Sequence, residues 1–296
     1  MNRHAYLIIA HNNFEILEKT LKILDDEKND FYIHIDKKVK NFDFEKIKNI
    51  VKKSKIIFTE RIDVKWGSSS QIDCELILLK SAVKNSYSYY HLISGVDMPI
   101  KPKEEIYNFF EKNLGKEFIH FQNKIYDMKN NDRFRLYHLF PYFLRSKYKY
   151  ILRIIEIFFI KLQKTLKINR IKDQNIQFQK GAQWFSITDN FVEYVLLKEK
   201  WIKDTFKYTF CCDEIFLQTL IINSEFKENL YSKELDDNHI TSVKRYIDWS
   251  RGTPYTFRKE DFNDLINSEA LFARKFDLNT DREIIDMIFE ELNKEK

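Results

Sequence analysis

The chain's 296 residues are enough for one large α/β domain or two small ones. A hydrophobic fraction of 44% with 16% aromatic residues excludes an intrinsically disordered chain. The net charge of +5 suits an anionic ligand or surface without demanding nucleic acid, and three cysteines, two of them adjacent, do not make a disulfide framework.

Strand-like and helix-like segments alternate through the first third of the chain. Short apolar runs predict strands at 6–10, 31–35, 55–58 and 89–93. Apolar residues at helical spacing predict helices that begin near Phe14 and cover 44–51 and 72–83. This alternation predicts an α/β fold with a mostly parallel central sheet of nucleotide-binding type.

Polar residues follow three of the predicted strands. His11 comes after the strand at 6–10, Asp36 after the strand at 31–35, and a Gly-Val-Asp turn at 95–97 after the strand at 89–93. Ligands of parallel sheets bind beyond the carboxyl ends of the strands, so this edge is expected to hold a nucleotide. The indole of Trp66 offers a flat face on which a base can stack. Histidine at position 11 could equally be an edge residue of the core.

The middle of the chain is basic. Residues 145–172 contain nine Lys and Arg but one acid, Glu156, and they enclose an apolar block at 151–160. About ten apolar residues are too few to span a bilayer. A basic amphipathic helix is typical of a segment that lies on a membrane surface, and the alternative is a packed helix with solvated charged flanks.

The last third carries acids and cations in an order that suits one chemistry. Asp213 and Glu214 open an apolar segment, and Arg258 and Lys275 follow. One carboxylate can act as a general base, and two fixed cations can hold a diphosphate leaving group. Taken alone, the acids could merely complement a helix N-terminus and the cations could be solvated surface charges. An Asp-x-Asp motif, which would hold a divalent ion, is absent from the sequence.

Eight motifs together resemble glycosyltransferase family 14, the Core-2/I-branching N-acetylglucosaminyltransferases and peptide O-xylosyltransferases. In chain order they are AYLIIAH at 5–11, HIDKK at 34–38, WGS at 66–68, LISGVDMPIK at 92–101, GAQWF at 181–185, DE at 213–214, YIDWS at 246–250 and FARKFD at 272–277. Each motif is weak alone, but their order and spacing indicate the family.

The resemblance implies roles for specific residues. Glu214 matches the family's catalytic glutamate, which takes the proton from the attacking hydroxyl in an inverting transfer. Arg258 and Lys275 match the cations that replace a metal ion at the diphosphate. Asp36 resembles the aspartate that binds uridine, and a turn or capping role is its alternative.

Aromatic residues supply candidates for the acceptor side, because aromatic faces stack on sugars. These are Trp184, Tyr246 and Trp249, with core packing as the alternative for Trp184. Arg133, Arg135 and Tyr137 could line the same side, although the middle of the chain matches the family poorly.

These observations lead to one prediction. The chain is expected to form a single GT-A-like domain, with a nucleotide-binding half at 1–122, a basic helical insertion at 123–180 and a catalytic and acceptor half at 181–296. We expect an inverting, metal-independent glycosyltransferase without a cofactor. Its donor is expected to be UDP-N-acetylglucosamine, with UDP-xylose as the alternative, and its acceptor a glycan of surface polysaccharide synthesis that can be lipid-linked.

The place of action follows from the amino-terminal sequence. The N-terminus runs directly into a predicted strand, which favours a bacterial, cytoplasmic protein that can lie at the inner membrane face through 145–172. The rival from another class is a non-catalytic carbohydrate- or membrane-binding module, and a metal-dependent glycosyltransferase is the second rival.

Overall fold

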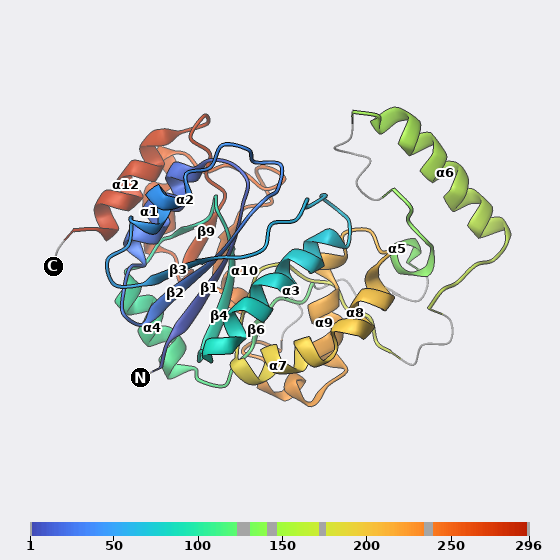
Figure 1. Ribbon diagram of the computed structural model, residues 1–296, viewed down its shortest axis with the longest axis horizontal. Helices are drawn as coiled ribbons and strands as arrows, with labels where there is room; N and C mark the ends of the chain where they lie inside the picture. The colour runs from blue at the N-terminus through green and yellow to red at the C-terminus, as the bar shows by residue number, and fades with distance from the viewer. Residues whose placement is uncertain (1, 123–130, 141–146, 172–175, 234–238, 295–296) are drawn as a thin grey trace.

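A six-stranded, mostly parallel sheet forms the centre of the computed structural model, which describes residues 2–122, 131–140, 147–171, 176–233 and 239–294 (Figure 1). The strand order is β3-β2-β1-β4-β7-β6. The strands are β1 His4–Ala10, β2 Asn29–Ile35, β3 Lys55–Phe58, β4 Tyr89–Ser94, β6 Phe118–Ile119 and β7 Phe185–Ile187. The β1–β2, β2–β3 and β1–β4 pairs are parallel, and β7 is antiparallel to both of its neighbours. The predicted fold class is therefore confirmed.

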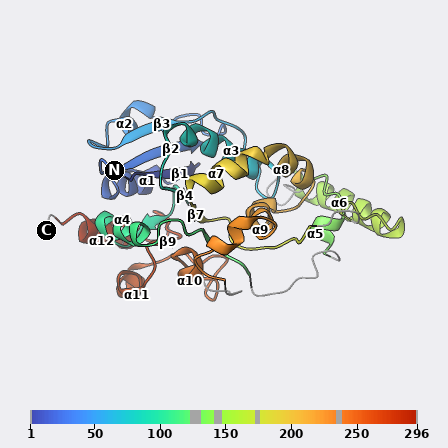
Figure 2. The ribbon, with the colours of Figure 1, turned by 90° about the horizontal axis from the view of Figure 1, so that it is seen from below.

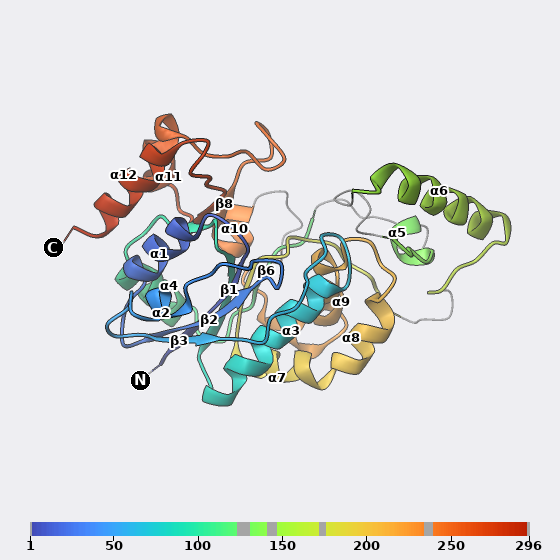
Figure 3. The same cartoon turned by 45° about the horizontal axis from the view of Figure 1, so that its top comes forward.

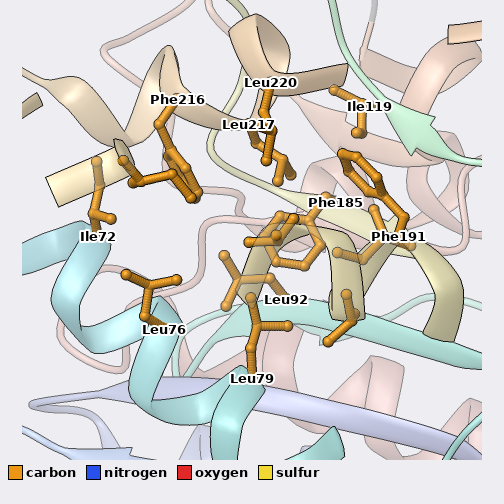
Figure 4. Packing of buried hydrophobic residues seen from close by; sticks show 14 of the residues in the cluster. Ile72, Leu76, Leu79, Leu92, Ile119, Phe185, Phe191, Phe216, Leu217 and Leu220 are labelled. Atoms are coloured by element: carbon orange, nitrogen blue, oxygen red, sulfur yellow. The ribbon is translucent and has the colours of Figure 1, made fainter. Parts of the chain in front are cut away.

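Successive residues of a strand point to opposite faces of the sheet, and in these strands the residues on both faces are mostly apolar. Helices therefore cover both faces. On one face Tyr6 and Ile8 of β1 pack in a cluster with α1 Phe14–Ile23, α2 Phe44–Lys48 and α4 Lys103–Lys112. On the other face Leu7 and Leu92 pack with α3 Ser70–Ala82, α7 Asp189–Leu197, α8 Glu199–Phe206 and α9 Phe216–Ile222. Figure 4 shows this second core, in which Leu76 of α3, Phe185 of β7 and Phe216 of α9 point toward one another.

A smaller sheet and its helices complete the fold. Its order is β5-β9-β8, with β5 Met98–Pro99, β8 Arg245–Ile247 and β9 Phe272–Arg274. A third apolar cluster joins it to α11 Phe262–Asn267 and α12 Arg282–Leu292. The short helix α10 His239–Val243 precedes β8, and Figure 2 shows α10 and α11 on the side of the molecule away from α2.

The middle of the chain projects from the body. The described part of residues 120–184 contains α5 Asp132–Arg135 and α6 Lys149–Thr165. Figures 1 and 3 show α6 at the opposite end of the molecule from α12. Within the residues that the structure describes, none of the helices combines the length and the apolar character needed to cross a bilayer. Residues 145, 146 and 172 of the predicted basic segment lie outside the described residues.

The predicted elements of the first third agree with the structure within a few residues at their ends. The largest difference is at the predicted helix 44–51, which ends at Lys48. The division into two halves and an insertion stays a prediction, and β6 and β7, which come from the two halves, pair within the same sheet.

Candidate active site

The carboxyl ends of β1, β2 and β4 lie together at one edge of the main sheet. The N–H of Asp36 donates to the carbonyl of Ala10 at 3.0 Å, and the N–H of Gly95 donates to the carbonyl of Ile9 at 2.9 Å. A Cβ at position 95 would lie 2.7 Å from the Cβ of Ala10, so only glycine permits this approach. The structure thus places exposed His11, buried Asp36 and the turn at 95–97 at the edge where a nucleotide is expected.

Asp36 organises the loop that leads to Trp66. Its carboxylate accepts hydrogen bonds from the N–H groups of Lys38 at 2.8 Å and Val64 at 3.3 Å. The Trp66 side chain is 37% exposed and meets the Phe210 ring edge-on, with 5.8 Å between ring centroids. The carboxylate of Asp36 is therefore bonded to the loop that precedes Trp66, and the turn role of Asp36 is present in the structure.

Glu214 ends a tight 3₁₀ turn, Cys212–Glu214, that is held by two other loops. The N–H of Cys211 donates to the carbonyl of Gly67 at 2.9 Å, and the N–H of Gly181 donates to the carbonyl of Glu214 at 2.8 Å. Cys211 has a φ of 49°, a left-handed conformation that costs energy for a residue with a side chain and recurs at functional sites. The turn therefore brings Glu214 beside the loop of Trp66 and the motif at 181–185.

The carboxylate of Glu214 is partly exposed and asymmetrically bound. Its side chain is 35% exposed, and Oε2 lies 3.4 Å from Nη1 of Arg133 and 3.3 Å from Nζ of Lys180. Among the described residues, Oε1 has no hydrogen-bond or ion-pair partner. The two cations hold one oxygen in place, and the other oxygen can accept a proton. The sequence named Arg133 on the acceptor side, whereas Lys180 was missed because it precedes the motif.

Two buried acids lie beneath Glu214. Asp213 Oδ2 accepts from Nε2 of Gln71 at 2.7 Å, and Glu75 Oε1 accepts from Nε2 of Gln183 at 2.8 Å. Burial and the charge of Glu214 raise the pKa of Asp213 to about 7. Burial and the charge of Asp213 raise the pKa of Glu75 well above its ordinary value. Glu75 was not among the predicted site residues, although apolar residues three and four positions away on the same helix indicate an inward side chain.

We expect the buried acid at 213 to make stability depend on pH. Because the folded pKa of Asp213 is raised, its contribution to the free energy of unfolding is fully present below the unfolded pKa near 4 and is lost as pH rises to about 7. Asp213→Asn should remove this dependence. Relative to the native chain, the variant's free energy of unfolding should therefore rise by about 1–3 kcal/mol between pH 4.5 and pH 7.5. Urea unfolding at several pH values measures it, with Asp204→Asn, an exposed acid of α8, as the control. An unchanged pH slope in the Asp213 variant would contradict the burial argument.

The segment that carries Arg258 runs beside the one that carries Lys275. The N–H of Phe257 donates to the carbonyl of Lys275 at 3.0 Å, and the N–H of Phe276 donates to the carbonyl of Val96 at 3.1 Å. The segment of Lys275 therefore borders the turn at 95–97, and the segment of Arg258 runs next to it. Neither side chain forms an ion pair with another residue that the structure describes. This leaves both cations available to an anion.

Arg274 is a cation that the sequence analysis did not identify. Its guanidinium stacks on Trp184 at 4.0 Å from the ring centroid and lies 3.6 Å from Asp97. Burial lowers the pKa of Arg274, and the charge of Asp97 opposes this effect. Because Arg274 covers one face of Trp184 and the ring also packs against the core, the structure favours the packing role of this tryptophan over an open acceptor platform.

The aromatic residues of the last third differ in exposure. Tyr246 is half-buried and packs edge-on against Phe257, which indicates a packing role. Trp249 is 53% exposed and lies next to His239, whose ring stacks on His120 at 4.1 Å. Burial and the charges of His120 and Arg274 lower the pKa of His239 to about 3. The ring of His239 that contacts His120 and Trp249 is therefore neutral.

The histidine pair connects Trp249 with the turn of Glu214. The N–H of Ala182 donates to Nδ1 of His120 at 3.0 Å. A Cβ at Gly181 would lie only 1.7 Å from the carbonyl oxygen of His120, so this position accepts no side chain. The same glycine donates to Glu214. Contacts thus lead from Trp249 through His239 and His120 to the loop at 181–182 and on to Glu214. Of the predicted acceptor residues Trp184, Tyr246 and Trp249, Trp249 has the most exposed ring.

Within the described residues, no group of three or more His, Cys, Asp or Glu side chains is arranged to hold a metal ion. A surface depression of about 570 Å³ between α3 and α8 shares no residue with the predicted site. Its four acids, Glu60, Asp63, Asp73 and Glu199, outnumber its two lysines, Lys80 and Lys203, so its net charge disfavours a diphosphate.

Comparisons with known proteins agree with the motifs. The family model described as Core-2/I-Branching enzyme matches residues 4–267. Xylosyltransferase 2 of Rattus norvegicus is 24% identical over 307 residues, which cover 97% of this chain and 33% of that protein. A beta-1,3-galactosyl-O-glycosyl-glycoprotein beta-1,6-N-acetylglucosaminyltransferase of Homo sapiens is also 24% identical, with 97% and 69% covered. The chain thus spans about a third of the xylosyltransferase relatives that it matches.

A solved structure is similar at low sequence identity. The apo form of mouse xyloside xylosyltransferase 1 is 11% identical, with a TM-score of 0.39 over 92% of this chain and 97% of that chain.

Proposed function

The chain belongs to the Core-2/I-branching enzyme family, and from this premise we propose that it is an inverting, metal-independent glycosyltransferase. It moves a sugar from a UDP-sugar to a hydroxyl group of a glycan. The observation that carries the proposal is the state of Glu214, whose Oε2 is held by two cations while Oε1 has no partner among the described residues. A carboxylate in this state at the nucleotide edge of an α/β sheet suits a general base.

The proposed chemistry is a single displacement. The acceptor hydroxyl attacks the anomeric carbon and passes its proton to Oε1 of Glu214. The bond between that carbon and the diphosphate oxygen breaks, and UDP leaves with an added negative charge. Arg258 and Lys275 oppose this charge as it develops. Attack from the face opposite the leaving group inverts the anomeric centre.

The donor and acceptor follow from the same proposal. Uridine is placed at the edge formed by His11, Asp36 and Trp66, and the acceptor is placed beside Trp249. The donor is UDP-N-acetylglucosamine or UDP-xylose, and the names of the relatives include transferases of both sugars. Incubation with a panel of UDP-sugars, with release of UDP as the readout, tests it. Release from none of them, with glycan acceptors present, would contradict the proposal.

Trp66 provides a separate test of the nucleotide edge. We expect Trp66→Ala to weaken UDP binding by about tenfold, because stacking of a base on an aromatic ring contributes about 1–3 kcal/mol. Isothermal titration with UDP measures it. Tyr150→Ala is the matched control, since Tyr150 is an exposed aromatic residue on α6, outside the site. Equal affinity in the Trp66 variant would place the base elsewhere.

A further inference from the structure

Two polar side chains of helix α6, Glu156 and Gln163, point inward. Glu156, the helix's single acid, is 5% exposed and pairs with Nδ1 of His138 at 3.0 Å. Gln163 is 1% exposed, and its amide exchanges two hydrogen bonds with the backbone of Tyr137, at 2.8 and 2.9 Å. Polar contacts therefore fix the orientation of this helix, since each buried polar group would be costly without its partner.

The opposite face of α6 is apolar and exposed. Ile154 and Phe158 are each 68% exposed, and the same stripe includes Ile151 and Leu162 at helical spacing. In the part of the chain that the structure describes, nothing covers these side chains. An exposed apolar patch of this kind is typical of a surface that binds another protein or a membrane.

Exposed cations lie along the same helix and at its ends. The exposed basic residues from position 147 to 167 are Lys147, Lys149, Arg153, Lys161, Lys164 and Lys167. Lys164 forms an ion pair with Asp132, and the others form no ion pair with another described residue. Because Glu156 is buried, the outer surface of the helix combines apolar side chains with positive charge alone. This combination complements an anionic lipid surface, where each cation contributes about 1 kcal/mol.

We propose that α6 lies in the surface of an anionic lipid bilayer, with the stripe of Ile151, Ile154, Phe158 and Leu162 at the acyl boundary and the long side chains of the exposed cations reaching the phosphates. Figures 1 and 3 show α6 at one end of the molecule, away from the central sheet. The inward position of Glu156 is what removes the negative charge that would oppose this contact.

The same helix is connected to the candidate base. Lys164 of α6 pairs with Asp132 of α5, and the next residue, Arg133, contacts Glu214 at 3.4 Å. If the proposed transferase activity holds, a chain docked through α6 presents Glu214 to acceptors carried by lipids. This second step rests on the proposed function, whereas the membrane contact does not.

Sedimentation with vesicles tests the contact. We expect the protein to bind vesicles of equal parts phosphatidylcholine and phosphatidylglycerol, to bind phosphatidylcholine alone weakly, and to release at high salt. Ile154→Asp with Phe158→Asp should weaken binding at least about tenfold. Leu197→Asp is the matched control, because Leu197 is 79% exposed on α7.

The charge requirement has its own variants. Arg153→Glu with Lys161→Glu should also weaken binding by about tenfold or more, and Lys52→Glu with Lys53→Glu gives the same net charge on a distant loop and should not. Lys164 is left unchanged, since its reversal would break the pair with Asp132. Circular dichroism and UDP affinity confirm that each variant is folded.

A direct depth measurement completes the test. The tryptophan fluorescence that Phe158→Trp adds to that of the native chain should be quenched by brominated lipids in anionic vesicles. The fluorescence that Leu197→Trp adds should not be quenched. Equal binding to neutral and anionic vesicles, or no quenching at position 158, would overturn the proposal. Self-association in solution that the Ile154 and Phe158 variant abolishes, without vesicle binding by the native chain, would show instead that the stripe joins two copies. UDP release from soluble substrates is independent of each of these outcomes.

Discussion

Glu214→Gln is expected to lower the rate of sugar transfer by about 10²–10⁴-fold, the usual loss when a general base is removed. Glutamine keeps the shape of the side chain, and the backbone bond from Gly181 to residue 214 does not involve the carboxylate. The variant should therefore fold normally and bind UDP with unchanged affinity. Single-turnover transfer and titration with UDP separate the chemical step from binding.

Asp213→Asn is the matched control for this experiment. It replaces the adjacent acid by its amide, but Asp213 is 6% exposed and its Oδ2 is bound by Gln71, so it cannot reach an acceptor. We expect its transfer rate to stay within a few-fold of the native rate. Near-native turnover in the Glu214 variant would refute the assignment, and loss confined to the Asp213 variant would move the base by one residue.

Removal of either candidate cation should have the second large effect. We expect Arg258→Ala or Lys275→Ala to cost about 2–4 kcal/mol of transition-state stabilisation, which corresponds to about 30- to 1,000-fold in kcat/KM. The affinity for UDP should fall as well, because in the proposed mechanism the cations contact the diphosphate before the glycosidic bond breaks. Lys259→Ala is the matched control, since this exposed neighbour of Arg258 is paired with Glu283 at 3.0 Å.

The metal question is decided in the same assay. With two cations at the diphosphate, activity should survive EDTA without a measurable loss. Activity that appears only on addition of manganese or magnesium would contradict the metal-independent mechanism. Near-native kcat/KM in both alanine variants would show that other groups hold the leaving group, and Arg274, which borders the same turn through Asp97, would be the next residue to test.

The sequence predicted the sheet well because its strands are apolar on both faces. Runs such as 6–10 and 31–35 are too short for buried helices, and helically spaced residues lie between them. The polar residues after those strands, His11 and Asp36, could be placed for the same reason. The acceptor residues were less predictable, because a tryptophan in a motif has the same sequence signal whether its ring is packed, as for Trp184, or open, as for Trp249.

Other parts of the site depended on contacts between distant segments. Three such contacts join residues that are far apart in the sequence: Glu214 pairs with Lys180, Arg274 stacks on Trp184, and buried Glu75 accepts a hydrogen bond from Gln183. The orientation of α6 is a similar case. Its composition predicted an amphipathic helix, but the outward direction of its apolar face depends on the amide of Gln163 and the carboxylate of Glu156 finding partners in another segment.

The pairing of β6 with β7 has a consequence for how this architecture can vary. Phe118 faces Ser186 and Ile119 faces Phe185, so the intervening segment at 120–184 leaves the sheet and returns to it at the same place. The entropy of closing such a loop rises only with the logarithm of its length. An excursion of this kind can be exchanged for a longer or shorter one while the register of the strands is kept. The projecting part around α6 is thus open to replacement, whereas the ends of the segment, which carry His120, Lys180 and Gly181 beside the turn of Glu214, are not.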